Sequence, residues 1–348
     1  MIPVHLNNAR SAIGLSIAAL ALTVTFAQQP GGPPPMRQHT TNAAAPLSLV
    51  TANREAPGKS AAKFVVEQSD RKITANGIPD HLVGRFPNRG NPNEITEQGY
   101  DIVIPASPKP APQPSAMRGP FGIALNGVFF DPGAAEFWQG NPAAGWTYEA
   151  LGGAVPLGID ENHAHVQPNG AYHYHGLPTL YLKSRNTKSG RHSPQIGWAA
   201  DGFPIYALYG NRDPKDPASP IVKLRSSYRL KSGARPAQPD APGGTYDGAF
   251  VQDYEYAEGS GDLDECNGRY AVTPEFPEGT YAYFLTEEWP VIPRLFRGTP
   301  VPLREERRGP PGGPRGPGAG PGSGPPPIGG EHRPRGDRPP PPAPGRPQ

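Results

Sequence analysis

Proline and glycine limit what this chain can fold into. The sequence has 50 prolines and 44 glycines among its 348 residues, which is well above ordinary globular usage. Much of the excess lies at the C-terminal end, between Gly309 and Gln348, where almost no residue is apolar. Such a segment cannot bury enough surface to offset the entropy of ordering it. The sequence therefore predicts a disordered Pro/Gly/Arg-rich tail over residues 304–348.

The N-terminal residues have the composition of an export signal. Arg10 gives a positive flank, an apolar run extends from Ala12 to Phe26, and small residues near Ala27 suit a signal peptidase. We therefore expect residues 1–27 to be a cleaved signal peptide and the protein to be exported, either periplasmic or secreted. The apolar run is short for a bilayer span, so a retained N-terminal anchor is the alternative. No other long apolar stretch exists, and no transmembrane span is expected in the mature chain.

Short strands are the secondary structure that the rest of the sequence predicts. Residues 28–62 are rich in proline, alanine, threonine and glycine and are expected to be a disordered linker. Between residues 63 and 303, short β-branched and aromatic runs are separated by turn residues, and no long segment has a 3.6-residue period. We therefore predict an all-β fold, a single irregular β-sandwich or barrel-like domain with long loops. The expected strands are Phe64–Glu67, Arg71–Ala75, Tyr100–Ile104, a hairpin over Phe121–Phe130, Tyr172–Tyr174, Ile205–Tyr209, Ser227–Leu230, Phe250–Tyr256, Arg269–Thr273, Thr280–Thr286 and Val291–Phe296. The proline-rich stretch Pro105–Pro120 is expected to be an external loop.

Four histidines form two His-x-His pairs, His163 with His165 and His173 with His175. Side chains alternate between the two faces of a strand, so the members of each pair share a face. The segment Pro168-Asn169-Gly170 lies between the pairs, and its proline and glycine suit a three-residue hairpin loop. That loop length places His165 opposite His173, and all four imidazoles are then expected on one face. A two-residue loop would split the pairs across opposite faces.

A shared transition metal ion is one explanation for such a patch. Imidazoles at neighbouring positions of a hairpin can reach one ion at the 2.0–2.1 Å that zinc requires. Neutral imidazole suits copper, zinc, nickel or iron, and copper or zinc is our expectation because the chain has one cysteine and almost no thiol ligands. A metal-free catalytic or ligand-binding cluster and simple packing beside Tyr172 and Tyr174 are the alternatives that remain open.

Three further residues are weaker candidates for the histidine site. Glu161 has the same parity as His163 along the expected strand and could add an oxygen ligand. Asp201 precedes Gly202 in a predicted turn and could bind the metal or orient a histidine. His81 also follows a turn and could join the site.

A run of carboxylates, Asp262-Leu263-Asp264-Glu265, is a second candidate for ion binding. Hard oxygen ligands on a sharp turn suit calcium, although the spacing is not that of an EF-hand. Asp262 or Asp264 could instead contribute to the histidine site, or cap a turn. Cys266 is expected to be a small buried residue, with a soft-ligand role beside the histidines as the alternative.

Several blocks of the sequence occur together in one known family. The central one is Tyr172-His173-Tyr174-His175. The others are Asn76-Gly77-Ile78-Pro79-Asp80-His81, Asn162-His163-Ala164-His165, Asp201-Gly202-Phe203-Pro204-Ile205-Tyr206, Asp262-Leu263-Asp264-Glu265-Cys266-Asn267-Gly268, Thr273-Pro274-Glu275-Phe276-Pro277 and Gly279-Thr280-Tyr281. Over roughly Phe64 to Pro300 the chain resembles the YHYH domain family, which is named after the central block. The resemblance implies an exported protein and a domain boundary, and no agreed reaction or substrate.

Charge and missing motifs restrict the function further. The formal net charge is +2 and no basic stripe crosses the core, which argues against nucleic acid as a partner. The sequence has no Gly-x-Ser-x-Gly elbow, phosphate loop or His-Glu-x-x-His helix, so whether the protein is an enzyme stays open. We predict an exported metal-binding protein that takes a small molecule, with the metal activating water or dioxygen if it catalyses a reaction. The competing hypothesis is a non-enzymatic module that binds an envelope polymer and is stabilised by calcium.

Overall fold

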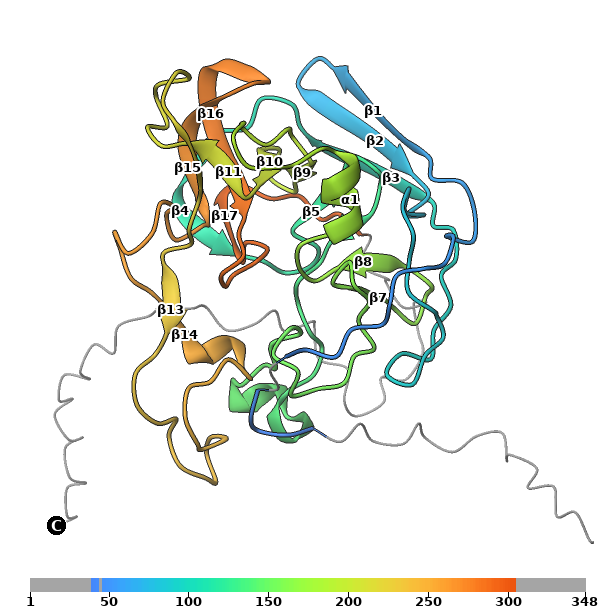
Figure 1. The fold of residues 1–348 in the computed structure, drawn as a ribbon, viewed down its shortest axis with the longest axis vertical. Helices are drawn as coiled ribbons and strands as arrows, with labels where there is room; N and C mark the ends of the chain where they lie inside the picture. Colours follow the sequence, from blue (N-terminus) through green and yellow to red (C-terminus); the bar gives the residue numbers. More distant parts are fainter. Residues whose placement is uncertain (1–38, 44–45, 305–348) are drawn as a thin grey trace, which may run out of the picture. The chain divides into compact units, whose positions relative to one another are not determined.

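The computed structural model describes residues 39–43 and 46–304 (Figure 1). Most of its regular structure is β-strand, and the strands form five sheets. The strands are β1 (Ala62–Glu67), β2 (Asp70–Ala75), β3 (Tyr100–Pro105), β4 (Pro110–Ala116), β5 (Gly122–Ala124), β6 (Phe129–Phe130), β7 (Ala164–Val166), β8 (Tyr172–Tyr174), β9 (Gly197–Ala199), β10 (Pro204–Ala207), β11 (Tyr209–Asn211), β12 (Ile221–Lys223), β13 (Tyr228–Leu230), β14 (Tyr254–Tyr256), β15 (Gly268–Thr273), β16 (Phe276–Leu285) and β17 (Leu295–Gly298). The helices are α1 (Thr179–Ser184) and the short 3-10 turns η1 (Trp138–Gly140), η2 (Pro142–Ala144) and η3 (Val251–Asp253). The prediction of a β fold is confirmed for this part of the chain.

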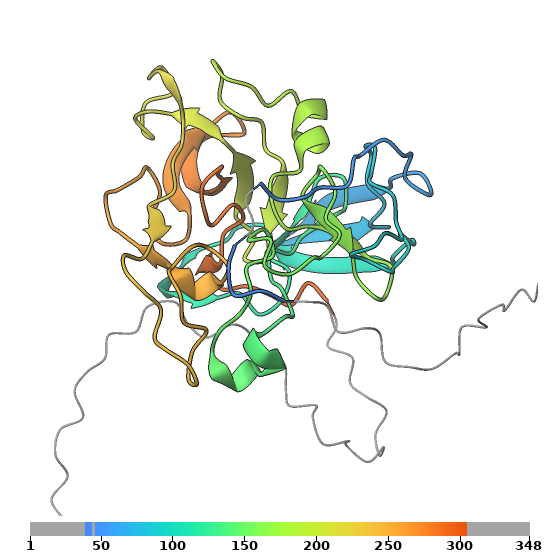
Figure 2. The same ribbon diagram turned by 60° about the horizontal axis from the view of Figure 1, so that its bottom comes forward.

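The largest sheet has eight strands in the order β15-β16-β10-β9-β5-β6-β8-β7. Two of its pairs, β6 with β8 and β10 with β16, are parallel. The sheet β1-β2-β3, blue to cyan, lies beside the green strands of the large sheet in both views (Figure 1, Figure 2). Its Ile73 and Ile102 belong to the same buried apolar cluster as Phe129 and Tyr172. The histidine-bearing strand β8 is thus an inner strand, and β7 forms the edge.

Local turn signals locate some strands well and others only in part. β5 and β6 flank the Asn126-Gly127 pair, where a hairpin is expected. The strand predicted over Phe250–Tyr256 begins instead with the 3-10 turn η3, so only its last three residues are β14. The strand predicted at Val291–Phe296 begins later, at Leu295.

The proline-rich stretch predicted to be a loop contains a strand. β4 pairs antiparallel with β17, with Ser115 opposite Phe296. The prolines of β4 stand at alternate positions in the sequence PAPQPSA. Alternate residues of a strand present their N–H groups to the same edge, so the missing donors all fall on one edge and the other edge can pair. The expectation of an external loop at this point is therefore wrong.

The segment expected to be a linker lies along the domain in its described part. Val50 forms a parallel bridge with Asp160. Ala52 is buried, and its N–H donates to Oε2 of Glu161 at 2.8 Å. The composition predicts disorder over residues 28–62, but these contacts hold Val50 and Ala52 against the domain.

Both ends of the chain lie outside the described residues. They include the signal peptide predicted at residues 1–27 and nearly all of the tail predicted at 304–348. Within the described ranges, no helix has the length and apolar character needed to cross a membrane.

Gly202, in the turn between β9 and β10, provides a test of this packing. Its φ is +90°, and a Cβ atom there would overlap the carbonyl oxygen of Pro105. Gly202→Ala should add left-handed strain of about 1–2 kcal/mol and an overpacking cost of about 1–3 kcal/mol. We expect urea unfolding to show a loss of about 2–5 kcal/mol. The matched control is Gly190→Ala, because Gly190 has a φ of +82° and open space around it. Equal losses in the two variants would contradict the steric argument.

Candidate metal centre

β7 and β8 form a hairpin around Pro168-Asn169-Gly170. Gly170 has a φ of +85°, and its N–H donates to the carbonyl of Gln167 at 2.8 Å, which closes the three-residue loop. His165 and His173 are partners in the antiparallel register. The predicted register is confirmed, and it places these two side chains on the same face.

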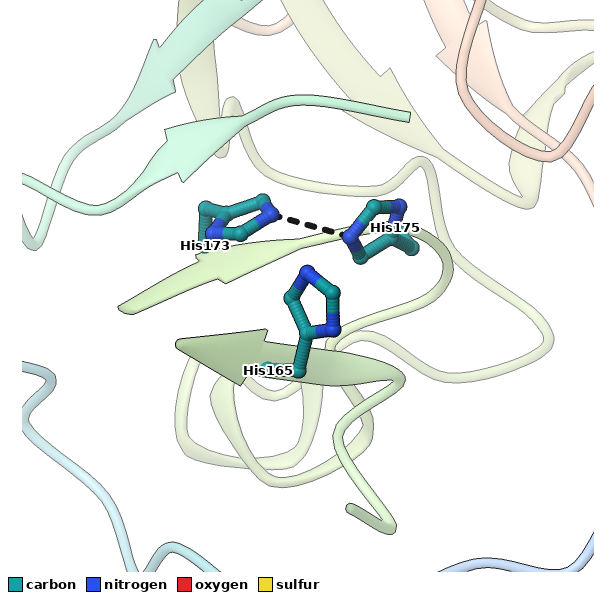
Figure 3. A group of neighbouring side chains, drawn as sticks. All are labelled: His165, His173 and His175. Carbon is teal, nitrogen blue, oxygen red and sulfur yellow. Dashed lines mark hydrogen bonds between the residues drawn. The ribbon is translucent and has the colours of Figure 1, made fainter. Parts of the chain in front are cut away.

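Three imidazoles converge on that face (Figure 3). His165, His173 and His175 can each offer one ligand atom, and these atoms all lie within 4.8 Å of one another. Two nitrogens bound to one tetrahedral zinc ion are about 3.3 Å apart, so small side-chain rotations suffice to reach such a geometry. His173 and His175 are buried and His165 is half-buried, which leaves the cluster most accessible on the His165 side.

Backbone carbonyls fix the tautomers of two of these rings. Nδ1 of His165 lies 3.1 Å from the carbonyl oxygen of Leu157, and Nδ1 of His173 lies 3.1 Å from that of Ala171. A carbonyl oxygen can only accept, so each Nδ1 carries the hydrogen and each neutral ring keeps its lone pair on Nε2. Metal-binding histidines are commonly oriented by such a hydrogen bond from the other ring nitrogen. Both rings are therefore in the form that binds an ion through Nε2.

The contact between His173 and His175 is the strongest sign that this cluster could hold an ion. Their Nε2 atoms are 2.9 Å apart. If Nε2 of His175 carried the hydrogen, its Nδ1 would be a buried acceptor with no donor among the described residues. If Nδ1 carries it, two lone pairs face each other. A cation between the two nitrogens would relieve that repulsion.

Burial keeps the two inner histidines neutral. Desolvation lowers the pKa of His173 and of His175 well below the ordinary value of 6.5, and the nearby charge of His165 lowers both further. The guanidinium of Arg304 acts on His173 in the same direction, as does that of Arg294 on His175. Neutral imidazole is the form that coordinates metals, so the site is ready to bind an ion at neutral pH.

His163 does not join the other three. Its carbonyl accepts the N–H of His175 at 2.7 Å, so the backbone has the expected register. Its φ is +52°, however, which turns the side chain out of the strand alternation. Its Nδ1 lies 2.8 Å from the carbonyl oxygen of Leu177. The structure therefore groups three histidines where four were expected.

The opposite face of β8 carries two tyrosines in a polar network. The hydroxyl of Tyr172 donates to Oδ2 of Asp160 at 2.8 Å. The hydroxyl of Tyr174 lies 2.7 Å from Nε2 of His81 and accepts from Nδ2 of Asn126 at 2.9 Å. His81, a weaker candidate ligand, is therefore bound to the tyrosine face and separated from the three histidines by the strand itself.

Two carboxylates expected near the histidines have other partners. Oε2 of Glu161 accepts the N–H of Ala52. Asp201 is buried, and its Oδ2 accepts from the hydroxyl of Tyr283 at 2.5 Å and from the N–H of Gly298 at 2.8 Å. Neither residue belongs to the histidine group. Asp201 instead joins β16 and β17 to the turn between β9 and β10.

The carboxylate run Asp262-Leu263-Asp264-Glu265 caps turns, which is one of the roles that the sequence suggests for it. Oδ2 of Asp262 accepts the N–H of Arg225 at 2.8 Å. Oδ1 of Asp264 accepts the N–H of Cys266 at 2.9 Å and that of Gly268 at 3.1 Å. Cys266 is fully buried. These oxygens are thus used by backbone donors, and among the described residues they form no group with the histidines.

Two polar residues on the histidine face have no signal in the sequence. Asp131 follows Phe129, the parallel partner of His173, by two positions, and Gln167 follows His165 by two. Nε2 of Gln167 donates to Oδ2 of Asp131 at 3.2 Å. β8 lies between β6 and β7, so this hydrogen bond spans the histidine face of β8. Only the parallel pairing of β6 with β8, which no local pattern predicts, brings the two together.

The two histidine-bearing strands lie inside a segment that matches one known protein family. The family model described as "YHYH protein" matches residues 101–298, more than half of the chain, including β7 and β8. The chain belongs to the YHYH protein family. No curated protein and no solved structure matches it. In this YHYH protein, the motif residues alternate between a histidine face with ligand geometry and a tyrosine face that is fully hydrogen-bonded.

Replacing Asp201 distinguishes a structural role from a role in the metal centre. Asp201→Ala would leave the buried hydroxyl of Tyr283 and the N–H of Gly298 without their acceptor. We expect a loss of about 2–4 kcal/mol in the free energy of unfolding. The metal content of the folded variant should equal that of the wild type. A selective loss of metal with unchanged stability would place Asp201 in the site instead.

The pH dependence of stability tests the burial of the inner histidines. The pKa values of His173 and His175 are lower in the folded protein than the 6.5 of the unfolded chain. Below pH 6.5 the unfolded chain therefore binds more protons, and their contribution to stability is lost as the pH falls. Chelator-treated protein should lose up to about 1.4 kcal/mol per pH unit for each histidine.

Urea unfolding from about pH 7.5 to 5 measures this slope. The double variant His173→Gln, His175→Gln should have a shallower slope than the wild type over the same range. Parallel slopes in the two proteins would mean that these histidines are as accessible to protons when folded as when unfolded.

Proposed function

We propose that this YHYH protein binds one copper or zinc ion through Nε2 of His165, His173 and His175. The observation that carries the proposal is the pair of buried Nε2 atoms 2.9 Å apart, with the third histidine of the group beside them. Such a cluster of neutral imidazoles is costly to bury without a ligand. Three nitrogen ligands of intermediate softness suit copper or zinc better than calcium or magnesium.

The ligand number bears on what the ion would do. Structural zinc sites are closed by four protein ligands, whereas catalytic sites have three and keep one position for water or substrate. The described residues group three histidines and no fourth ligand. We therefore infer a site with an exchangeable position, where a bound ion would act on water or dioxygen. The half-buried His165 gives the side from which a small molecule enters.

The place of action is part of the proposal. The apolar run Ala12–Phe26 with Arg10 before it has the features of an export signal. We infer that the protein works outside the cytoplasm. Its one cysteine, Cys266, is buried and unpaired, so the chain forms no internal disulfide. A module that binds its partner through the ion without catalysing a reaction would share the same ligands, and activity screens of the loaded protein separate the two.

Elemental analysis of the full chain tests the metal site. The wild type, reconstituted with copper or zinc and freed of excess ion, should hold about one ion per chain. The double variant His173→Ala, His175→Ala should hold none, because one histidine of the group remains and metal affinity falls steeply with each ligand lost. The metal should also raise the stability of the wild type by about 2.7 kcal/mol at a hundredfold excess over Kd.

His163→Ala is the matched control. His163 belongs to the same hairpin but lies outside the group of three, so its variant should keep the full metal content. No ion in the wild type after reconstitution, or equal loss in the control and the double variant, would contradict the proposed ligand set.

A further inference from the structure

An arginine beside the metal centre has hydrogen-bond donors without acceptors. Nη1 of Arg304 pairs with Oδ2 of Asp131 at 3.2 Å. Nε and Nη2 are shielded from solvent and have no partner among the described residues. Leaving a buried charged donor unsatisfied costs about 1–3 kcal/mol or more. Nε and Nη2 form one edge of the guanidinium, the edge that binds two oxygens of an anion side by side.

A second unsatisfied donor belongs to a tyrosine that packs on the same phenylalanine as Arg304. The hydroxyl of Tyr100 is buried and has no hydrogen-bond partner among the described residues. The ring of Tyr100 packs on Phe129, with the ring centroids 4.4 Å apart, and Cζ of Arg304 lies 5.1 Å from the centroid of the same Phe129 ring. The charges of Arg304 and Asp131 both act on the pKa of Tyr100, which burial raises to about 12. The tyrosine therefore stays protonated and can donate.

The Phe129 ring that both side chains approach lies one strand away from the three histidines. Phe129 is the parallel partner of His173, and neighbouring strands are about 4.8 Å apart. Arg304 also pairs with Asp131, whose hydrogen bond to Gln167 spans the histidine face. Arg304 also lines a groove of about 610 Å³ together with Ser115, Arg118 and Phe296. Oγ of Ser115 is likewise buried without a partner.

We propose that Arg304 and Tyr100 form an oxyanion-binding subsite next to the histidine centre, which takes a carboxylate or phosphate group of a small-molecule ligand. One oxygen pair would lie on the Nε and Nη2 edge, and the Tyr100 hydroxyl would donate a third hydrogen bond. The position of this subsite relative to a metal ion rests on the proposed function. Asp131 neutralises part of the Arg304 charge and holds its guanidinium through Nη1, so the remaining edge is fixed in place before the anion arrives.

Anion titration of the full chain tests the subsite. Sodium phosphate and sodium acetate are titrated separately, at constant ionic strength, into the metal-free and the copper-loaded protein in a calorimeter. One of the two anions should bind, more tightly to the loaded protein, and shift the visible absorption of bound Cu(II). The tighter of the two identifies a phosphate or a carboxylate as the natural group. Arg304→Gln should weaken binding at least tenfold and abolish the spectral shift, with unchanged copper content.

Three further variants distinguish binding by the Nε and Nη2 edge of Arg304 from a general effect of charge and from unfolding. Arg304→Lys keeps the charge without the two-donor edge and should bind the anion at an intermediate level. Tyr100→Phe should weaken binding three- to tenfold. Arg118→Gln removes an exposed charge from the same groove and should bind as the wild type does. Thermal unfolding of each variant shows that it is folded.

Each outcome decides one of the two proposals. If the wild type binds copper but neither anion, or if Arg304→Gln and Arg118→Gln behave alike, the subsite is overturned and the metal site stands. If no metal binds, the proposed function fails, while anion binding to the metal-free chain that Arg304→Gln removes would still support the subsite.

Discussion

The alternation of side chains along β8 is the constraint on which this site depends. The strand is buried on both faces, with His173 and His175 on one and Tyr172 and Tyr174 on the other. Buried polar groups are tolerated only where they have partners. A slip of one residue would exchange the two faces and remove every one of those partners. The polar environment of each face therefore fixes the register of the strand, and the register fixes where the imidazoles lie.

One buried carboxylate connects that register to distant parts of the chain. Asp160 accepts hydrogen bonds from the hydroxyl of Tyr172 and from the N–H groups of Gly84 and Asn162, at 2.8, 2.8 and 2.9 Å. It also forms a backbone bridge with Val50. Burial raises the pKa of Asp160, and these donors act against that shift. The N-terminal segment, the start of β7 and strand β8 are thus held by one group, which gives the ligands little freedom before any ion binds.

The sequence predicts those parts of the site whose determinants are local. Three adjacent residues, Pro168-Asn169-Gly170, set the hairpin register, and the prediction was correct. His163 departs from strand alternation because a positive φ, which is uncommon for any residue other than glycine, turns its side chain away. Asp131 and Arg304 reach the site through a parallel strand pair and through the C-terminal end of the described chain, and neither contact has a periodic or turn signal. Local patterns thus predicted the histidine cluster, while its surroundings required the tertiary structure.

The charge of the histidine cluster bears on the kind of ligand that a bound metal ion would favour. Neutral imidazoles leave a divalent ion with its full charge, and the nearby guanidiniums are paired, Arg304 with Asp131 and Arg294 with Glu149. A partly buried divalent ion in such surroundings would keep a net positive charge, which an anionic ligand would offset. An oxyanion that reaches the ion would also satisfy the unused edge of Arg304 over Phe129. The electrostatics of the histidine cluster and the unsatisfied donors of Arg304 beside it therefore favour the same class of ligand, an oxyanion.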